Sequence, residues 1–153
     1  MNTKRTKSQV GRYARTKGAR FEREVAEAFK PLFPDARRGI GQTRCAGEVP
    51  DVTGTPFWVE GKFRQHLDLQ KAMDQANRAR AIKNDMRPPV VIWRKLRARS
   101  LCVTCQLGLL IQLWVGGQLN ALDSSPTLVH LDFDDWLGIV RRWLDTFVAQ
   151  GKV

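Results

Sequence analysis

A chain of 153 residues in which 42% are hydrophobic and 27% are charged is long enough for one globular domain and argues against a fully disordered protein. The longest apolar run covers only residues 107–111, far fewer than the roughly 20 that cross a bilayer, and no apolar segment follows the basic N-terminus. We therefore expect neither a membrane span nor a secretory signal. Three cysteines are too few to staple a secreted fold, so a reducing cytoplasm is the expected compartment.

The net charge of +11 points to nucleic acid or another anionic partner, and it is distributed unevenly. Residues 1–100 carry 23 basic and 10 acidic side chains, whereas residues 101–153 carry 3 basic and 5 acidic ones. The first twenty residues hold seven basic side chains and no acid, and residues 1–16 show no apolar periodicity. We predict a flexible basic arm over 1–16 that neutralises phosphates, with a solvated tail as the alternative, and a single domain over 17–153.

Apolar spacing predicts the elements of the first half of this domain. A helix begins near Lys17, buries Phe21, Val25 and Phe29 on one face, and ends at the prolines that follow. The segment 37–47 allows a short strand. Two strands of a hairpin, 49–52 and 57–63, flank turn residues, and a second helix runs from a cap at Asp68 to about residue 82.

The second half contains more strands and a final helix. Buried strands are predicted over residues 90–93 and 101–105, and a further strand over 127–133. The segment 107–114 fits either a helix or a strand, and 116–126 is predicted to be a loop. A complete apolar stripe, which includes Trp136, Val140 and Trp143, predicts the last helix. This order predicts an α/β fold with one mixed sheet between helices.

The predicted hairpin carries the residues that are best suited to catalysis or metal binding. Because side chains alternate along a strand, Trp58, Glu60 and Lys62 share one face, and the hairpin places Asp51 beside them. Two neighbouring carboxylates repel unless a cation lies between them, and such oxygen ligands suit Mg²⁺ or Mn²⁺. A lysine beside the metal can orient or deprotonate water, or stabilise charge on a phosphate. The alternative interpretation is a solvated, salt-bridged strand face.

These residues carry a family resemblance. Pro50-Asp51 followed by Glu60-Gly61-Lys62 resembles the PD-(D/E)xK nuclease signature. Residues 17–24, KGARFERE, resemble the helix that opens archaeal-type Holliday junction resolvases, and Arg44-Cys45-Ala46-Gly47 resembles their Arg-Ser-Ala-Gly segment. The resemblance covers residues 17–63. Small phage-encoded proteins of this class are similar in size, and a phage origin would place the chain in a host cytoplasm.

The resemblance implies a restriction-endonuclease-like core and a set of site residues. Asp51 and Glu60 would bind Mg²⁺, with Mn²⁺ as a substitute, and the backbone carbonyl of Gly61 would also face the metal. Lys62 would position the attacking water. Glu22 would supply an acid from the first helix; both Glu22 and Glu24 flank its apolar face, so Glu24 remains the alternative.

The resemblance also implies a DNA substrate. Arg44 would contact the scissile region, and the further candidates for DNA contacts are Lys17, Arg20, Arg23 and Arg38. Gln75 resembles a helix glutamine of some relatives. The expected protein is a homodimeric, Mg²⁺-dependent resolvase of four-way junctions, because two matched nicks suit a two-fold dimer. The alternatives are a repair, replication or restriction nuclease on the same fold, or a non-catalytic DNA-binding protein whose acidic cluster is structural.

Overall fold

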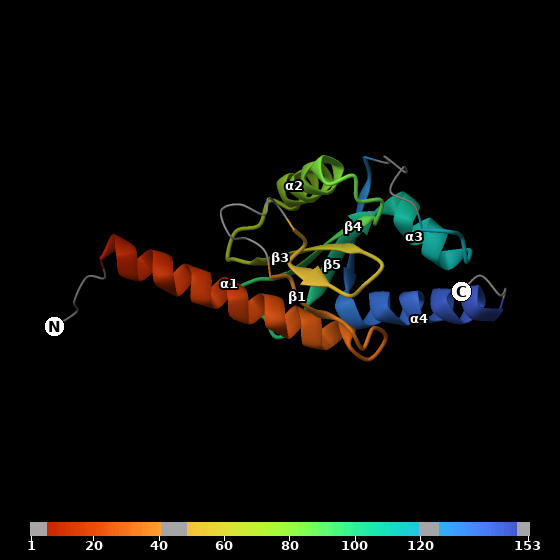
Figure 1. The fold of residues 1–153 in the computed structure, drawn as a ribbon, viewed down its shortest axis with the longest axis horizontal. Helices are drawn as coiled ribbons and strands as arrows, with labels where there is room; N and C mark the ends of the chain where they lie inside the picture. The colour runs from red at the N-terminus through yellow and green to blue at the C-terminus, as the bar shows by residue number, and fades with distance from the viewer. Residues whose placement is uncertain (1–5, 41–48, 120–125, 150–153) are drawn as a thin grey trace.

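A computed structural model of the protein describes residues 6–40, 49–119 and 126–149. These residues form four helices and six strands (Figure 1). In chain order the elements are α1 (Lys7–Phe29), β1 (Arg37–Arg38), β2 (Val52–Thr53), β3 (Trp58–Phe63), α2 (Leu69–Ile82), β4 (Pro89–Arg94), β5 (Cys102–Gln106), α3 (Leu107–Trp114), β6 (Leu128–Asp132) and α4 (Phe133–Ala149).

The six strands form one mixed sheet whose spatial order is the order of the chain. Strands β3 and β4 are parallel, because α2 carries the chain back between them, and the other neighbouring pairs are antiparallel. Figure 1 shows α2 on one side of the sheet and both α1 and α4 on the other. The predicted α/β arrangement of a mixed sheet flanked by helices is therefore confirmed.

Alternation along the central strands divides the core between the two faces. On the face toward α1 and α4, Val59 and Ile92 pack in one large cluster with Phe29 and Trp136, all of them fully buried. On the face toward α2, Val91 packs against the helix in a smaller cluster. Each fully buried large apolar side chain contributes about 1.5 to 3 kcal/mol, so the larger cluster supplies most of the stability.

The second helix begins where the sequence predicts. Asp68 is its N-cap, and the Asp68 carboxylate accepts a hydrogen bond of 2.9 Å from the backbone N–H of Lys71. This bond satisfies a backbone donor that the first turn of a helix otherwise leaves without a partner. The end near residue 82 is also confirmed, and Asn84 follows it with a positive φ of 51°.

The first helix starts earlier than predicted and takes in residues 7–16 of the predicted flexible arm. It begins at Lys7 rather than near Lys17, while residues 1–5 lie outside the described part of the chain. A capping box starts it: Thr6 accepts from the backbone of Gln9, and the Gln9 side chain accepts from the backbone of Thr6. Apolar periodicity gives no sign of this extension, because a helix anchored by packing at one end propagates through residues that bury nothing.

The added turns project from the body of the molecule (Figure 1). Most described side chains between residues 8 and 16 are exposed, among them Val10 and Tyr13. The ambiguous segment 107–114 is helix α3, whose Leu109 and Leu113 point into the core. Within the described ranges, no helix is both long enough and apolar enough to cross a membrane.

Candidate active site

The β2–β3 hairpin brings Asp51 beside Glu60 and Gly61, as predicted. Val52 pairs with Val59, and the backbone N–H of Asp51 donates to the Val59 carbonyl at 2.8 Å. The Asp51 carboxylate then turns back to β3 and accepts a hydrogen bond of 2.8 Å from the Gly61 N–H. Asp51 and Glu60 are both buried, with exposed fractions of 9% and 8%. Two carboxylates are thus withdrawn from solvent on neighbouring strands.

Lys62 lies on the same face of β3 as Glu60 and is held from two directions. Its Nζ lies 2.5 Å from the Glu60 Oε1 and 3.1 Å from the Gln75 Oε1 on α2. The crossover helix packs on this face of the sheet, which explains why a residue of α2 reaches the β3 lysine. The three side chains form a fixed polar cluster at the boundary between sheet and helix.

Glu22 and Glu24, the two acids of α1, have different surroundings. Glu22 has a side chain that is 17% exposed, and it accepts a hydrogen bond of 2.5 Å from the Arg38 Nε on β1. Its charge acts on Asp51, so Glu22 lies on the side of the helix that faces the hairpin. Glu24 is 41% exposed and forms a two-pronged ion pair with Arg94 at the end of β4. Of the two acids, the structure brings Glu22 toward the hairpin carboxylates.

Burial and repulsion together raise the pKa of Asp51 from 3.8 to about 7. Desolvation is the largest cause, and the charge of Glu60 is the next. The hydrogen bond from the Gly61 N–H lowers the pKa, Glu22 raises it, and the Lys62 ammonium lowers it. A carboxylate whose negative form is disfavoured in this way is stabilised by any cation that binds next to it.

The acids at the hairpin have some, but not all, of the features of a divalent metal site. The acids at the hairpin offer carboxylate oxygens, which hard cations such as Mg²⁺ and Mn²⁺ prefer. They also repel one another, as the raised pKa of Asp51 records. Within the described ranges, however, no three His, Cys, Asp or Glu side chains lie close enough together to hold a metal ion, and Glu60 is neutralised by Lys62. The chemistry of the donors suits a divalent cation, although the described residues do not gather three such donors in one place.

Gly39 supports the site, a role that its place in the sequence does not predict. A Cβ built on Gly39 would lie 2.1 Å from the Pro50 carbonyl oxygen, a separation that no side chain tolerates. The Gly39 N–H donates to the Asp51 carbonyl at 2.8 Å, so this close approach fixes the segment after β1 against the backbone of Asp51. Only the contact partner reveals the requirement, because a glycine beside an arginine-rich segment has no distinctive spacing.

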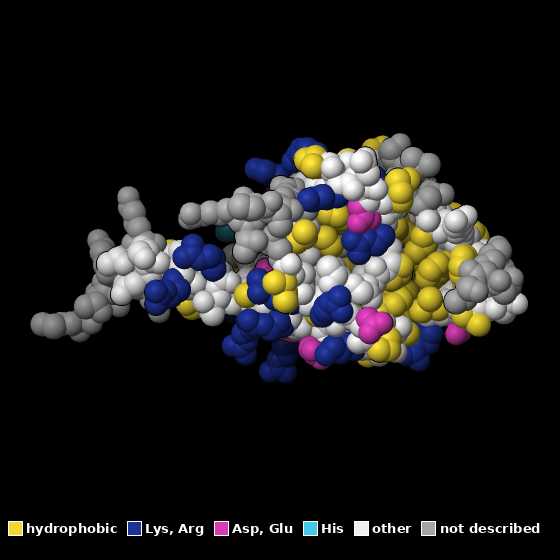
Figure 2. All heavy atoms as spheres, in the orientation of Figure 1, with side chains coloured by type: hydrophobic (Ala, Val, Ile, Leu, Met, Phe, Trp, Pro, Cys, Tyr) yellow, Lys and Arg dark blue, Asp and Glu magenta, His cyan; other side chains and the backbone are white. Residues whose placement is uncertain are grey.

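The predicted DNA-contact residues lie mostly around α1. Arg20 and Arg23 are exposed on that helix, and the Lys17 Nζ lies 4.4 Å from the centre of the Phe63 ring. Arg38 is engaged by Glu22, as described above. Arg44 lies outside the described residues. On the face drawn in Figure 2, Lys and Arg side chains lie along α1 and hydrophobic side chains gather toward α3 and α4.

Comparison of this chain with known protein families, curated proteins and solved structures gives no match.

Proposed function

We propose that this protein is a metal-dependent DNA endonuclease that hydrolyses phosphodiester bonds, with four-way junctions as its substrate. The observation that carries the proposal is the convergence of Asp51, Glu60 and Lys62 on one hairpin, the arrangement that the PD-(D/E)xK resemblance requires. The restriction-endonuclease-like core is part of the same proposal, and the mixed sheet between helices is compatible with it.

The electrostatics of the site favour an enzyme over a surface salt bridge. The chain has a net charge of +11, yet two of its acids are buried side by side. Burying carboxylates together opposes folding unless a positive group compensates, and repulsive acids near a phosphate would weaken DNA binding. Both disadvantages disappear when a divalent cation joins the acids to the phosphate.

Asp51 and Glu60 would hold Mg²⁺ or Mn²⁺, together with the Gly61 carbonyl, and Glu22 would complete the acidic set. When bound, such an ion lowers the pKa of water and stabilises negative charge on phosphate oxygens. Lys62 would stay near the reacting phosphate, because Gln75 restrains its ammonium, and there it would orient the attacking water. Arg20 and Arg23 are exposed on the same helix as Glu22 and would hold neighbouring phosphates.

The proposal includes a homodimer, because resolving a four-way junction needs two nicks on opposing strands. Each copy would supply one hairpin site. The assembly can be measured by sedimentation, independently of any cleavage.

A cleavage assay tests the function. Labelled four-way junction, linear duplex and single strand are incubated with the wild-type protein in Mg²⁺, in Mn²⁺ and in EDTA. Cleavage should require the metal, favour the junction and disappear in Glu60→Gln. The matched control is Glu27→Gln, which removes an acid whose side chain is 68% exposed on α1 and should leave cleavage intact.

Each outcome has a definite meaning. Metal-dependent cleavage of linear DNA at the same rate as junctions would support an endonuclease but refute the junction substrate. Binding without cleavage in either metal would refute the enzyme and leave a DNA-binding protein with a structural acidic cluster. Equal cleavage by Glu60→Gln and wild type would refute the site.

A further inference from the structure

A pocket of about 470 Å³ opens beside the candidate site. It lies between α1 and the carboxyl ends of the parallel strands β3 and β4, where ligands commonly bind in open α/β sheets. From α1 it is lined by Tyr13, Lys17 and Arg20 among others, and from the strand ends by Phe63 and Arg94. Its volume is within the range of small-molecule sites, roughly 300 to 1,000 Å³.

The pocket shares a wall with the site. Phe63 follows Lys62 directly in β3, and Phe21, another lining residue, precedes Glu22 in α1. A Cβ built on Gly61 would lie 3.6 Å from the Phe21 ring and 3.5 Å from the Asp51 carboxylate. A ligand in the pocket would therefore lie near the Asp51 carboxylate, separated from it by the Phe21 ring and the backbone of Gly61.

The lining combines aromatic rings with positive charge. Phe21 and Phe63 stack with their ring centres 5.3 Å apart, and the Arg94 guanidinium lies 4.9 Å from the centre of the Phe63 ring. Glu24 neutralises Arg94 through the ion pair described above. Within the described part of the chain, no carboxylate is ion-paired with Lys17 or Arg20, so these two residues keep the pocket positive.

Tyr13 is the most exposed of the aromatic residues that line the pocket. It lies on the projecting part of α1, and 57% of it is exposed, whereas Phe21 is only 2% exposed and belongs to the core. An exposed aromatic ring with two cations within the next two turns of the same helix is the combination that binds single-stranded nucleic acid: the ring stacks a base and the cations hold its phosphates.

We propose that this pocket accepts one unstacked nucleobase of the DNA, adjacent to the phosphate that is cleaved. The proposal rests on the proposed function and adds to it the feature that the enzyme recognises. Tyr13 stacks on the base, and Lys17 and Arg20 contact the phosphates that flank it. Stacking on an aromatic side chain contributes roughly 5- to 150-fold in affinity per base.

The pocket gives a physical basis for selecting branched DNA. In a linear duplex, a base must leave its stack and its partner before it can enter, and the free energy required is comparable with what stacking on the protein returns. At a bulge the base has no pairing partner, and at an open branch point it lacks a stacking neighbour on one side, so less free energy is required and more of the gain is kept. Selectivity for branched DNA then follows from one pocket, without any contact to a particular base sequence.

Binding in EDTA tests the proposal without cleavage. The ligands are a linear duplex, the same duplex with a one-nucleotide bulge, and a bulge that carries the fluorescent base 2-aminopurine. Wild type should bind the bulged duplex about tenfold more tightly than the linear one, and binding should quench the 2-aminopurine. Tyr13→Ala should abolish both the preference and the quenching. Tyr13→Phe should keep both, because it keeps the ring, and so should Val10→Ala, which shortens another exposed side chain of α1.

Two results would overturn the proposal: Tyr13→Ala with wild-type preference and quenching, or wild type with no preference at all. Thermal unfolding of each variant, which should match wild type because Tyr13 is largely exposed, confirms that the fold is kept. The proposed function can fail separately. Quenching without cleavage in Mg²⁺ would leave the nucleobase pocket and remove the nuclease, and cleavage without quenching would do the reverse.

Discussion

Replacing Asp51 with asparagine should stabilise the metal-free protein above neutral pH. The Asp51 carboxyl has a folded-state pKa of about 7 against a reference value of 3.8, chiefly because it is buried next to Glu60. Between these two pH values the folded state binds a proton that the unfolded state has lost, so the free energy of unfolding falls as the pH rises. Above pH 7 both states are ionised and the loss is complete.

The size of the effect follows from the pKa difference. One pKa unit corresponds to about 1.4 kcal/mol, so the penalty above pH 7 reaches roughly 4 kcal/mol. Asparagine carries no such penalty, and its side-chain oxygen can still accept the hydrogen bond from the Gly61 N–H. For a chain of this length, a change of that size corresponds to a rise of about 10 °C in the Tm.

The assay is urea unfolding of wild type and Asp51→Asn in EDTA, at several pH values from 4 to 8. The stability of wild type relative to the variant should decline from pH 4 to pH 7 and then stay constant. Asp145→Asn, a matched change at an exposed residue of α4, should show no such trend. If Asp51→Asn is less stable than wild type at pH 8, or if the difference does not change with pH, the electrostatic account of the hairpin is wrong.

Three further predictions concern other parts of the chain. Glu22→Gln should reduce cleavage by at least about 100-fold, as expected for a group that supports a metal-assisted site, whereas Glu24→Gln should leave the rate close to wild type. In a single-turnover assay, the reverse order would show that the wrong acid has been assigned. Residues 1–12 carry four basic side chains, and deleting them should flatten the slope of log K, the DNA-binding constant, against log salt by about 2 to 3 on duplex DNA, with little change in Tm. An unchanged slope would mean that these charges make no contact with DNA. Asp68→Ala removes the cap of α2 and should lower the free energy of unfolding by about 1 kcal/mol in urea titrations, while a neutral result would show that the Lys71 N–H finds another acceptor.

Local patterns predict β3 and the second helix well, whereas β2 is only Val52–Thr53 instead of the predicted 49–52. The alternation of Trp58, Glu60 and Lys62 and the turn before them determine which side chains share a face, and the register follows from the short connection. Asp68 is a local signal as well, because an N-cap acts on backbone groups within three residues. In these segments the sequence neighbours are also the neighbours in space.

The remaining parts of the site depend on contacts between distant segments, and periodicity contains no information about them. Glu24 and Arg94 pair across 70 positions, and Glu22 meets Arg38 from a different element. The pocket at Tyr13 exists because α1 continues upstream of its packed face. From the sequence, either Glu22 or Glu24 could be the acid that α1 contributes to the site. The packing of α1 against the sheet sets the rotation of the helix, and that rotation decides which of the two faces the hairpin.

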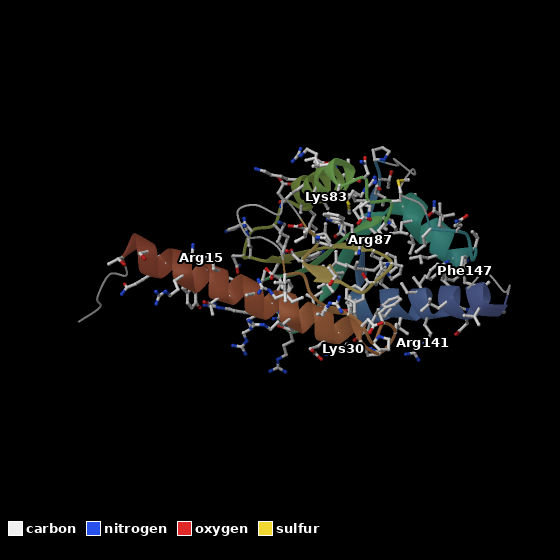
Figure 3. All side chains as sticks on the ribbon, viewed as in Figure 1. Arg15, Lys30, Lys83, Arg87, Arg141 and Phe147 are labelled. Carbon is white, nitrogen blue, oxygen red and sulfur yellow. The ribbon has the colours of Figure 1, made fainter. Side chains whose placement is uncertain are left out.

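Because residues 7–16 are helical, their basic residues lie at fixed distances along the helix axis from Glu22. A helix rises 1.5 Å per residue, so Arg12 lies about 15 Å along the axis from Glu22, and Arg15, on the projecting part of α1 (Figure 3), lies about 10 Å from it. B-form DNA rises 3.4 Å per base pair, so on DNA aligned with α1 these arginines would reach phosphates about three to five base pairs from the cut. An irregular arm would spread its contacts over many positions, whereas a rod concentrates them in one narrow footprint. Affinity should therefore rise in a step, rather than gradually, as the DNA on that side is lengthened through this interval.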